Sequence, residues 1–481
     1  MQQKSLTKNS IFYMIYNILN VVFPFISGMY VAHILLPSSI GEVAHASNIA
    51  QYFVILAFLG IPTYGLREIS KARHDREKLN KVYSELLVIN FCSTIVFLAA
   101  YWILVFSVEA FRSNLPLYLI SSFSIALNVL NNAWLYEGLE EFRFVSLRNA
   151  VFKAIMLVLL ILLVRKPEHY LRYAALSVIG IAGNYVVNIV HARKHVHFQL
   201  HGLEFRRHMG PILTLVLVNI AIELYSLVDI TMLGFLSTKA NVAYYKYGSY
   251  INKVLLSIVS TFTTVLVPRL ATTYRDDKDT FNELLTKGVR VILLFALPMI
   301  VGIQFVSDFL ICKIYGQQYI TASYVLKILS PVLLISPIGY LLGSRVLLVA
   351  GKEKKMTISV AAGAIVNVIG NYFLIQAYQE MGAAVASVIS EIVVMIIYLI
   401  LGSGFYSLHG LKGSVFRILL ASAVMGAYLL AVSFLPLGGW PKTVFQIIGA
   451  VIVYACVLLV TKEEMALQYT KRLFAVLNRN K

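Results

Sequence analysis

The chain of 481 residues is 59% hydrophobic and 13% charged, and its mean hydropathy is +0.77. Soluble proteins carry roughly a quarter charged residues, so this composition excludes an ordinary soluble protein and indicates one that crosses a membrane many times. The formal net charge of +18 would suit a nucleic-acid partner, but most lysines and arginines lie between alternate apolar segments. That distribution is typical of cytoplasmic loops, so we expect no nucleic acid.

Apolar stretches of about 20 residues are long enough to cross a bilayer. The first follows the basic start MQQKSLTKNS, is too long for a signal-peptide core and shows no small-residue cleavage site, so we interpret it as an uncleaved span. The sequence predicts fourteen spans: 9–33, 39–62, 83–107, 115–137, 149–165, 170–192, 210–234, 242–268, 287–311, 322–348, 356–377, 381–403, 415–435 and 441–461.

The distribution of basic residues predicts the orientation. With the N-terminus in the cytoplasm, the predicted cytoplasmic loops contain the basic clusters at 67–81, 193–207 and 352–355, and the outer turns contain far fewer lysines and arginines. This asymmetry agrees with the positive-inside rule. Because the number of spans is even, both termini are predicted to be cytoplasmic.

The predicted span 242–268 has one polar face. Its polar residues recur every three or four positions, as on one side of a helix: Lys246, Ser249, Tyr250, Lys253, Ser257, Ser260 and Thr264. An ionised side chain in hydrocarbon costs several kcal/mol, so such residues normally face a bundle interior or an aqueous cavity. Polar residues can also simply join helices, but polar faces in several spans together favour a shared hydrated cavity.

The charged residues of the spans leave two interpretations open. Glu223 lies near the middle of the span before Lys253, so the two form either a structural ion pair or a cavity in which Lys253 attracts an anion and Glu223 titrates. Asp229, Lys246 and Lys327 lie closer to the outer boundary, where a side chain can also extend to water.

Two further titratable residues lie within predicted spans. Glu391 is deep in the twelfth span and has no obvious partner nearby in the sequence, so it is a candidate for coupling transport to an ion. His45 is a candidate for a pH sensor.

The two halves of the chain repeat one another at a spacing of about 200 residues. Val43-Ala44 corresponds to Val242-Ala243, Arg67 to Arg269, and Glu85-Leu86-Leu87 to Glu283-Leu284-Leu285. Such a repeat predicts two similar bundles around a central path. The predicted organisation is a six-helix bundle at 1–192, a cytoplasmic linker at 193–209, a second six-helix bundle at 210–403, two additional spans within 415–461 and a cytoplasmic tail at 462–481.

The linker is rich in histidine and basic residues. Metal binding by His191, His195 and His197 is one interpretation, and a solvated loop against anionic lipid head groups is the favoured one. The three cysteines stand singly and show no metal or redox spacing.

The sequence contains no motif for soluble catalysis. No predicted loop exceeds about twenty residues, which leaves no room for a catalytic domain. The patterns GxxxxGK[ST], HExxH and GxSxG do not occur. We therefore expect no enzymatic activity and no cofactor, and transport would have to use an ion gradient, the membrane potential or the substrate's own gradient.

The run VDITMLGFLSTKANVAYYKYGSYINKVLLSIVSTFTTVLVPRLA at 228–271 resembles the Wzx-type flippases that move lipid-linked oligosaccharides in bacterial O-antigen and capsule synthesis. These belong to the multidrug/oligosaccharidyl-lipid/polysaccharide exporter superfamily. The likeness extends to NSIFYMIYNILNVVFPFISGMYVAHIL near the N-terminus, to the GxPTYGLREISKARHD-type turn at 60–75, and to ILSPVLLISPIGYLLGSRVLLVAGKEKK at 328–355. The motifs identify the family and not the substrate.

The resemblance implies an all-α polytopic fold of twelve core helices in two bundles plus two extra helices, which works by alternating access in the bacterial inner membrane. It implies an undecaprenyl-pyrophosphate-linked oligosaccharide as substrate in a cationic cavity, with Lys253, Lys246, Lys327 and Tyr250 as candidates to bind it. Candidates to couple H⁺ or Na⁺ are Glu223, Asp229 and Glu391. Membrane lipids and the polymerase and chain-length proteins of the pathway are expected partners.

Alternative functions stay open at this point. A lipid II flippase would have the same fold, and nearly the same features of the sequence would support that function. A drug/sodium antiporter of the superfamily would favour an acidic, aromatic cavity for cations, and the lysines argue against it. A membrane-bound polymerase or acyltransferase would need a large outer loop or a buried catalytic histidine, for which the sequence offers no candidate.

Overall fold

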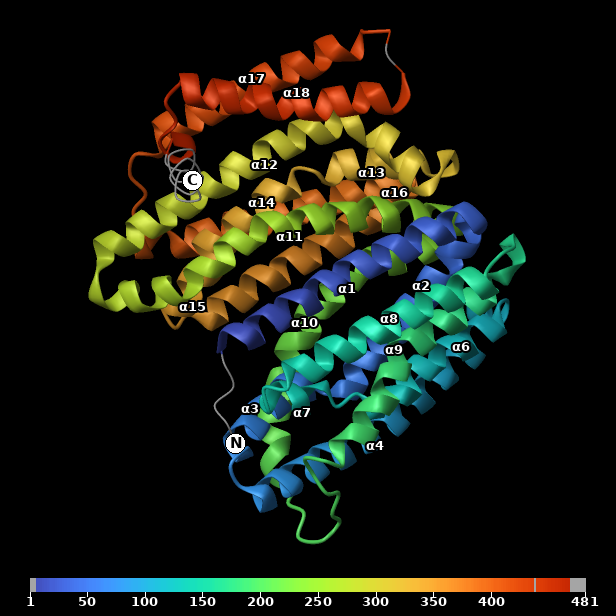
Figure 1. Cartoon of the computed structure of the whole chain (residues 1–481). Coiled ribbons are helices and arrows are strands. Elements are labelled where there is room, and N and C mark those ends of the chain that lie inside the picture. The colour runs from blue at the N-terminus through green and yellow to red at the C-terminus, as the bar shows by residue number, and fades with distance from the viewer. Residues whose placement is uncertain (1–5, 437, 468–481) are drawn as a thin grey trace, which may run out of the picture. The chain divides into compact units, whose positions relative to one another are not determined.

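The computed structural model of the chain is helical (Figure 1). It describes residues 6–436 and 438–467, without the side chains of 6–17, 182, 214–225, 262 and 265. No strand occurs in the described residues. Nine helical stretches of this described part are long and apolar enough to cross a membrane, and a tenth is a pair of helices bent by 43°. The predicted all-α, multi-pass membrane fold is confirmed.

Contacts divide the chain into two compact units, Met1–Ala243 and Tyr244–Lys481. The first contains α1 (Leu6–Ile34), α2 (Pro37–Phe58), α3 (Ile61–Ala72), α4 (Arg76–Ser107), α5 (Glu109–Arg112), α6 (Leu115–Ala126), η1 (Leu127–Leu130), α7 (Ala133–Gly138), α8 (Phe142–Leu163), η2 (Pro167–His169), α9 (Tyr170–Ala192) and α10 (Arg206–Leu236). The bundle limits predicted from the sequence stay predictions.

The second unit begins at Tyr244, which lies within α11 (Lys239–Asp276). It contains α12 (Lys278–Tyr315), η3 (Gln317–Tyr319), α13 (Thr321–Leu329), α14 (Val332–Gly339), the π-helical turn η4 (Tyr340–Arg345), α15 (Val346–Val349), α16 (Glu353–Gly402), η5 (Ser403–Phe405), α17 (Leu411–Ser433) and α18 (Gly439–Val460).

Several predicted spans are interrupted helices. The span 322–348 consists of α13, α14, η4 and α15, and Pro331 and Pro337 lie in it, where the missing N–H of each proline removes a helical hydrogen bond. The predicted spans 356–377 and 381–403 correspond to the two arms of α16, which meet at the non-helical Gln379 (φ 55°, ψ −128°). Interrupted helices inside a membrane are tolerated where neighbouring protein satisfies the freed backbone groups.

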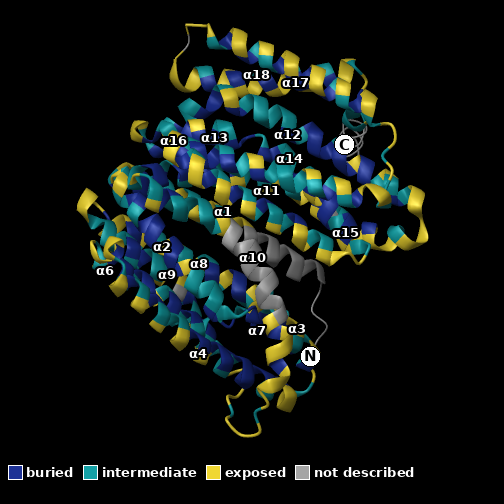
Figure 2. Ribbon diagram, turned by 180° about the vertical axis from the view of Figure 1, so that it is seen from behind, coloured by how far each residue is buried: buried dark blue, intermediate teal, exposed yellow. Residues whose placement is uncertain are grey.

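The buried residues of the second unit centre on α12. The apolar core includes Phe281, Ile292 and Leu333, and Tyr454 on α18 donates a hydrogen bond to the carbonyl of Leu294 at 2.8 Å. The opposite side of α18 is apolar yet exposed, with Ile448 among its residues, and Figure 2 shows exposed residues along both α17 and α18. Large exposed aliphatic side chains on a membrane span are suited to contact with lipid.

Helices α4 and α12 begin in the same way in their respective units. Asp75 accepts hydrogen bonds from the first-turn amides of α4, and Asp277 accepts one from the amide of Thr280 in α12. The Lys78 amide lowers the pKa of Asp75, and the Thr280 hydroxyl and amide lower the pKa of Asp277. These equivalent caps repeat local structure at the same spacing as the predicted pair Arg67 and Arg269. The predicted correspondence of Glu85 with Glu283 is out of register with the caps, because Glu85 follows its cap residue by ten positions and Glu283 follows its own by six.

Candidate functional site on helix α11

One side of α11 packs against α13. A Cβ atom at Gly248 would lie 2.6 Å from the carbonyl oxygen of Ala322 and 2.8 Å from the Cβ of Val325, so the approach of the two helices requires glycine. Asn252 and Val259 lie on the same side of α11 and are buried. The packed side of the helix is therefore fixed by its small and buried residues.

Most of the predicted polar stripe lies on the other side of α11, but Ser249 is buried. Lys253, Ser257 and Thr264 are exposed, and Lys246 and Tyr250 are half-buried. Because Gly248 faces α13, the helical repeat of 3.6 residues turns these side chains away from the packed side. The structure thus brings three of the predicted substrate-binding residues, Lys246, Tyr250 and Lys253, onto one face.

The hydroxyl groups of the stripe bond to their own helix. Ser257 Oγ donates to the carbonyl of Val254 at 2.7 Å, and Thr264 Oγ1 donates to the carbonyl of Ser260 at 3.1 Å. Each hydroxyl then still has lone pairs that can accept a hydrogen bond. The face combines the positive charge of Lys253 with acceptors suited to a hydroxylated ligand.

The predicted pairing of Lys253 with Glu223 stays open. The side chain of Glu223 lies outside the described residues. Among the described residues, no carboxylate forms an ion pair with Lys253. The cavity interpretation and the ion-pair interpretation therefore both remain predictions.

Lys327 has a different environment from Lys253. Its Nζ lies 2.7 Å from Asp308 Oδ1, its side chain is 19% exposed, and the ring of Tyr324 lies 5.3 Å from Nζ. Ser323 donates a hydrogen bond to the same carboxylate. The charge of Lys327 is balanced within the second unit, so its role in binding a substrate is the less favoured part of the prediction.

The two other acidic candidates are half-buried on different helices. Asp229 lies on α10, two positions before Thr231. Glu391 lies on the second arm of α16 and follows Ser390, whose hydroxyl donates to the carbonyl of Gly363 at 2.8 Å and joins the two arms. Both acids make interactions in the structure, and their roles in ion coupling stay predictions.

The sequence did not reveal the polar contact between α2 and α10. Asn48 donates hydrogen bonds to the carbonyl of Leu227 at 2.9 Å and to Thr231 Oγ1 at 2.7 Å. Asn48 was visible as one of several polar residues on a face of the second span, but nothing in the sequence identified its partners. We call the contacts of Asn48, His45 and Lys239 the α2–α10 seam.

The seam also contains His45, whose side chain is 1% exposed. Lys239 Nζ donates to the carbonyl of Gly234 at 2.7 Å and lies 3.1 Å from His45 Nδ1. Tyr118 OH lies 3.1 Å from the same ring nitrogen. These buried contacts give His45 a packing role, while its predicted role in pH sensing is not tested.

Comparison with known proteins decides the family. A family model described as "Polysaccharide biosynthesis protein" matches residues 6–274, more than half of the chain. The chain belongs to this family. A protein of Escherichia coli (strain K12) named as an O-antigen transporter is 22% identical over 407 residues, which cover 81% of this chain and 95% of that protein. A Shigella dysenteriae protein of the same name is 21% identical over 387 residues, with 79% and 96% covered.

Solved structures share the fold. A lipid II flippase in an inward closed conformation has a TM-score of 0.76 and 17% sequence identity, covering 94% of this chain and 99% of that one. An inward-facing multidrug transporter has a TM-score of 0.62 and 15% identity, covering 80% and 94%. The family predicted from the sequence is confirmed, and this is a multi-pass membrane protein of a polysaccharide-biosynthesis family.

Proposed function

We propose that the protein moves undecaprenyl-pyrophosphate-linked oligosaccharide units from the cytoplasmic to the outer leaflet of the bacterial inner membrane by alternating access. The observation that carries this proposal is the exposed face of α11, where Lys253 stands among hydroxyl groups on a helix of membrane-spanning length. The family and the named O-antigen transporters that it resembles support a lipid-linked saccharide as the substrate class.

The chemistry of this substrate requires such a face. A pyrophosphate that carries sugars cannot cross hydrocarbon unaided, because charge at the bilayer centre is strongly disfavoured. A lysine in a hydrated path attracts the phosphate oxygens, and serine and threonine oxygens accept hydrogen bonds from sugar hydroxyls. The polyprenyl tail can remain in lipid while the head group passes.

The decisive experiment replaces Lys253 with alanine in cells whose surface polysaccharide depends on this protein. We expect Lys253→Ala to abolish export at normal protein levels, and Lys253→Arg, which keeps the charge, to retain part of it. Lys327→Ala is the matched control, since that lysine already has a carboxylate partner. Unchanged export by Lys253→Ala at matched expression would refute the assigned role.

A second experiment addresses ion coupling. We expect Glu391→Gln to abolish transport driven by a proton or sodium gradient in vesicles, because the amide cannot exchange a proton or neutralise Na⁺. Binding of the lipid-linked substrate should persist in this variant. Intact coupling would remove Glu391 from the candidates.

A lipid II flippase is the alternative function, and its substrate carries the same kind of head group. Transport assays with the purified protein in vesicles distinguish the two. We expect faster movement of the polysaccharide repeat unit than of lipid II, and the reverse order would favour the alternative.

A further inference from the structure

In the first unit, the segment that connects α9 to α10 lies over the beginning of α4. Asn80 Oδ1 accepts a hydrogen bond from the backbone amide of His197 at 2.8 Å, and Ser84 Oγ accepts one from the amide of Gln199 at 3.0 Å. Both amides belong to the segment between α9 and α10. This segment was predicted to be a solvated loop; many of its side chains are exposed, yet its backbone is attached to α4.

A buried carboxylate completes this cover. Glu85 is 0% exposed and accepts hydrogen bonds from the amide of Glu204 at 2.6 Å, from the guanidinium of Arg207 and from His208 Nε2 at 2.7 Å. Tyr64 OH lies 2.8 Å from the other ring nitrogen of His208. The end of the segment thereby seals the same side of α4 one turn further along.

In the part of the second unit that the structure describes, only the first of these attachments is repeated. Asn282 has the same position after its helix cap as Asn80, and its Oδ1 accepts a hydrogen bond from the amide of Ser407 at 2.9 Å. The segment between η5 and α17 covers only 406–410, whereas the segment between α9 and α10 covers 193–205. The shorter segment enters α17 before it can cover the next turn of α12.

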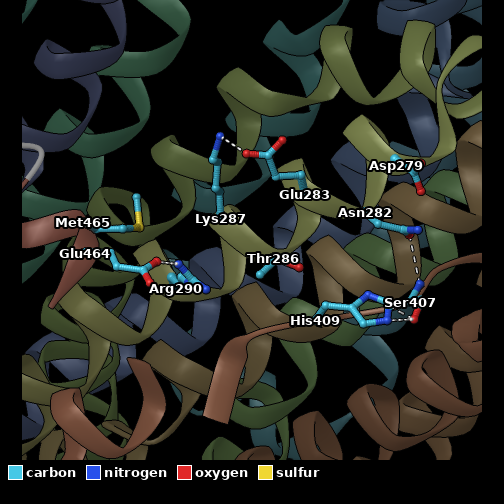
Figure 3. Close-up of a pocket in the computed structure, with 10 residues that line it drawn as sticks. All are labelled: Asp279, Asn282, Glu283, Thr286, Lys287, Arg290, Ser407, His409, Glu464 and Met465. Carbon is cyan, nitrogen blue, oxygen red and sulfur yellow. Dashed lines mark hydrogen bonds and ion pairs between the residues drawn. The ribbon is translucent and has the colours of Figure 1, made fainter. Parts of the chain in front are cut away.

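A cavity of about 430 Å³ lies along this uncovered side of α12. Its lining combines acidic and basic side chains from three parts of the second unit, and Figure 3 labels them: Asp279, Glu283, Lys287 and Arg290 of α12, His409 before α17 and Glu464 after α18. These residues stand near the ends of membrane-spanning helices. The cavity is therefore at the level where lipid head groups are expected.

The charges of the cavity differ in how firmly they are held. Arg290 is bonded to Glu464 and to the carbonyl of Gly410 at 2.8 Å and is 14% exposed, so it is a fixed group. Lys287 pairs with Glu283 at 2.6 Å, but their side chains are 50% and 61% exposed. Ion pairs as exposed as this one contribute little free energy. Lys287 and Glu283 can therefore separate, and each can bind a charged group of a ligand instead.

We propose that this cavity binds the head group of an aminophospholipid that carries both a phosphate and a primary amine. Lys287 would receive the phosphate, and Asp279 and Glu283 would receive the ammonium group through charge-assisted hydrogen bonds. A purely anionic head group would meet the same carboxylates and be repelled. A quaternary ammonium has no N–H to donate. The site lies in the second unit and is independent of the transported substrate.

The test measures lipid retention by the full-length protein. The protein is purified in mild detergent, mixed with equal amounts of phosphatidylethanolamine, phosphatidylcholine and phosphatidylglycerol, and examined by native mass spectrometry. We expect phosphatidylethanolamine to be retained preferentially. The double variant Asp279→Asn/Glu283→Gln should lower this preference about tenfold, the effect of losing about one charge-assisted hydrogen bond.

Two variants make the result specific. Ser407→Trp should abolish retention by filling the cavity, since the bond to Asn282 uses only the backbone of Ser407. Glu77→Gln is the matched control, because Glu77 is exposed at the position of α4 that Asp279 has in α12. Three results would overturn the proposal: equal retention of the three lipids, an unchanged preference in the double variant, or retention only after removal of residues 468–481. The third result would mean that the chain's own basic end occupies the cavity.

Discussion

The α2–α10 seam and the exposed face of α11 show two uses of polar residues in membrane-spanning helices. In the seam, Asn48 of α2 and Lys239 at the start of α11 both donate hydrogen bonds to groups on α10. His45 is buried beside Lys239. On α11, Lys253 and Ser257 are exposed, and among the described residues the hydroxyl of Ser257 bonds to its own helix.

The difference follows from where glycine allows close approach. In the seam, Gly41 and Gly234 bring backbone and ring atoms together on the polar side of the contact. On α11, Gly248 brings the helix to α13 on the side that lacks the stripe. Polar groups therefore serve packing in the first case and remain available to a ligand in the second.

The largest expected effect concerns the glycine contact of the seam. A Cβ at Gly41 would lie 1.6 Å from the carbonyl oxygen of Lys239. Because backbone cannot move aside as a flexible side chain can, Gly41→Ala should lower the free energy of unfolding by more than about 3 kcal/mol. Thermal unfolding in detergent measures the effect. Gly302→Ala, with no atom within 4 Å of its Cβ, is the control and should unfold at or above the native temperature; equal behaviour of the two variants would contradict the contact.

A smaller effect is expected for the hydrogen bonds of the seam. Asn48→Ala removes two bonds but leaves Thr231 bonded to Tyr52 and to Leu227, so no partner loses all its bonds. We expect a loss of about 1 kcal/mol, since each bond between membrane helices contributes about 0.6 kcal/mol on average. Ser257→Ala on α11 should change the unfolding free energy by less than about 0.5 kcal/mol. A comparable loss in both variants would remove the distinction between the two regions.

The smallest effect is expected for the ion pair of Lys327. In a double-mutant cycle with Lys327→Gln and Asp308→Asn, the coupling should be about 0.5 kcal/mol, because Asp308 is 47% exposed and solvent screens the pair. Lys253→Gln should leave stability unchanged and stop export instead. Export that depends on Lys327 as strongly as on Lys253 would show that the paired lysine also contacts substrate.

Much of the candidate site was predictable because it lies on one helix. The positions of Lys246, Tyr250 and Lys253 along 242–268 follow from helical periodicity, and in the structure they lie on one face of α11, while their role in binding stays a prediction. The partner of Lys327 was not predicted, because Asp308 lies on α12 and the pair forms only when α13 packs beside it. The cover over α4 was missed for a similar reason, since Glu85 and His208 are distant in the sequence.

The sequence by itself determined that this is an all-helical membrane protein and that α11 has a polar side, because hydropathy and helical period depend only on the order of residues along one segment. Only the tertiary structure decided which polar side chains are buried and which stay exposed. The sequence of one segment does not indicate whether a neighbouring helix supplies a hydrogen-bond partner for its serine, asparagine or lysine side chains. That partner depends on the few glycines, such as Gly41 and Gly248, that let two helices come close enough for such contacts.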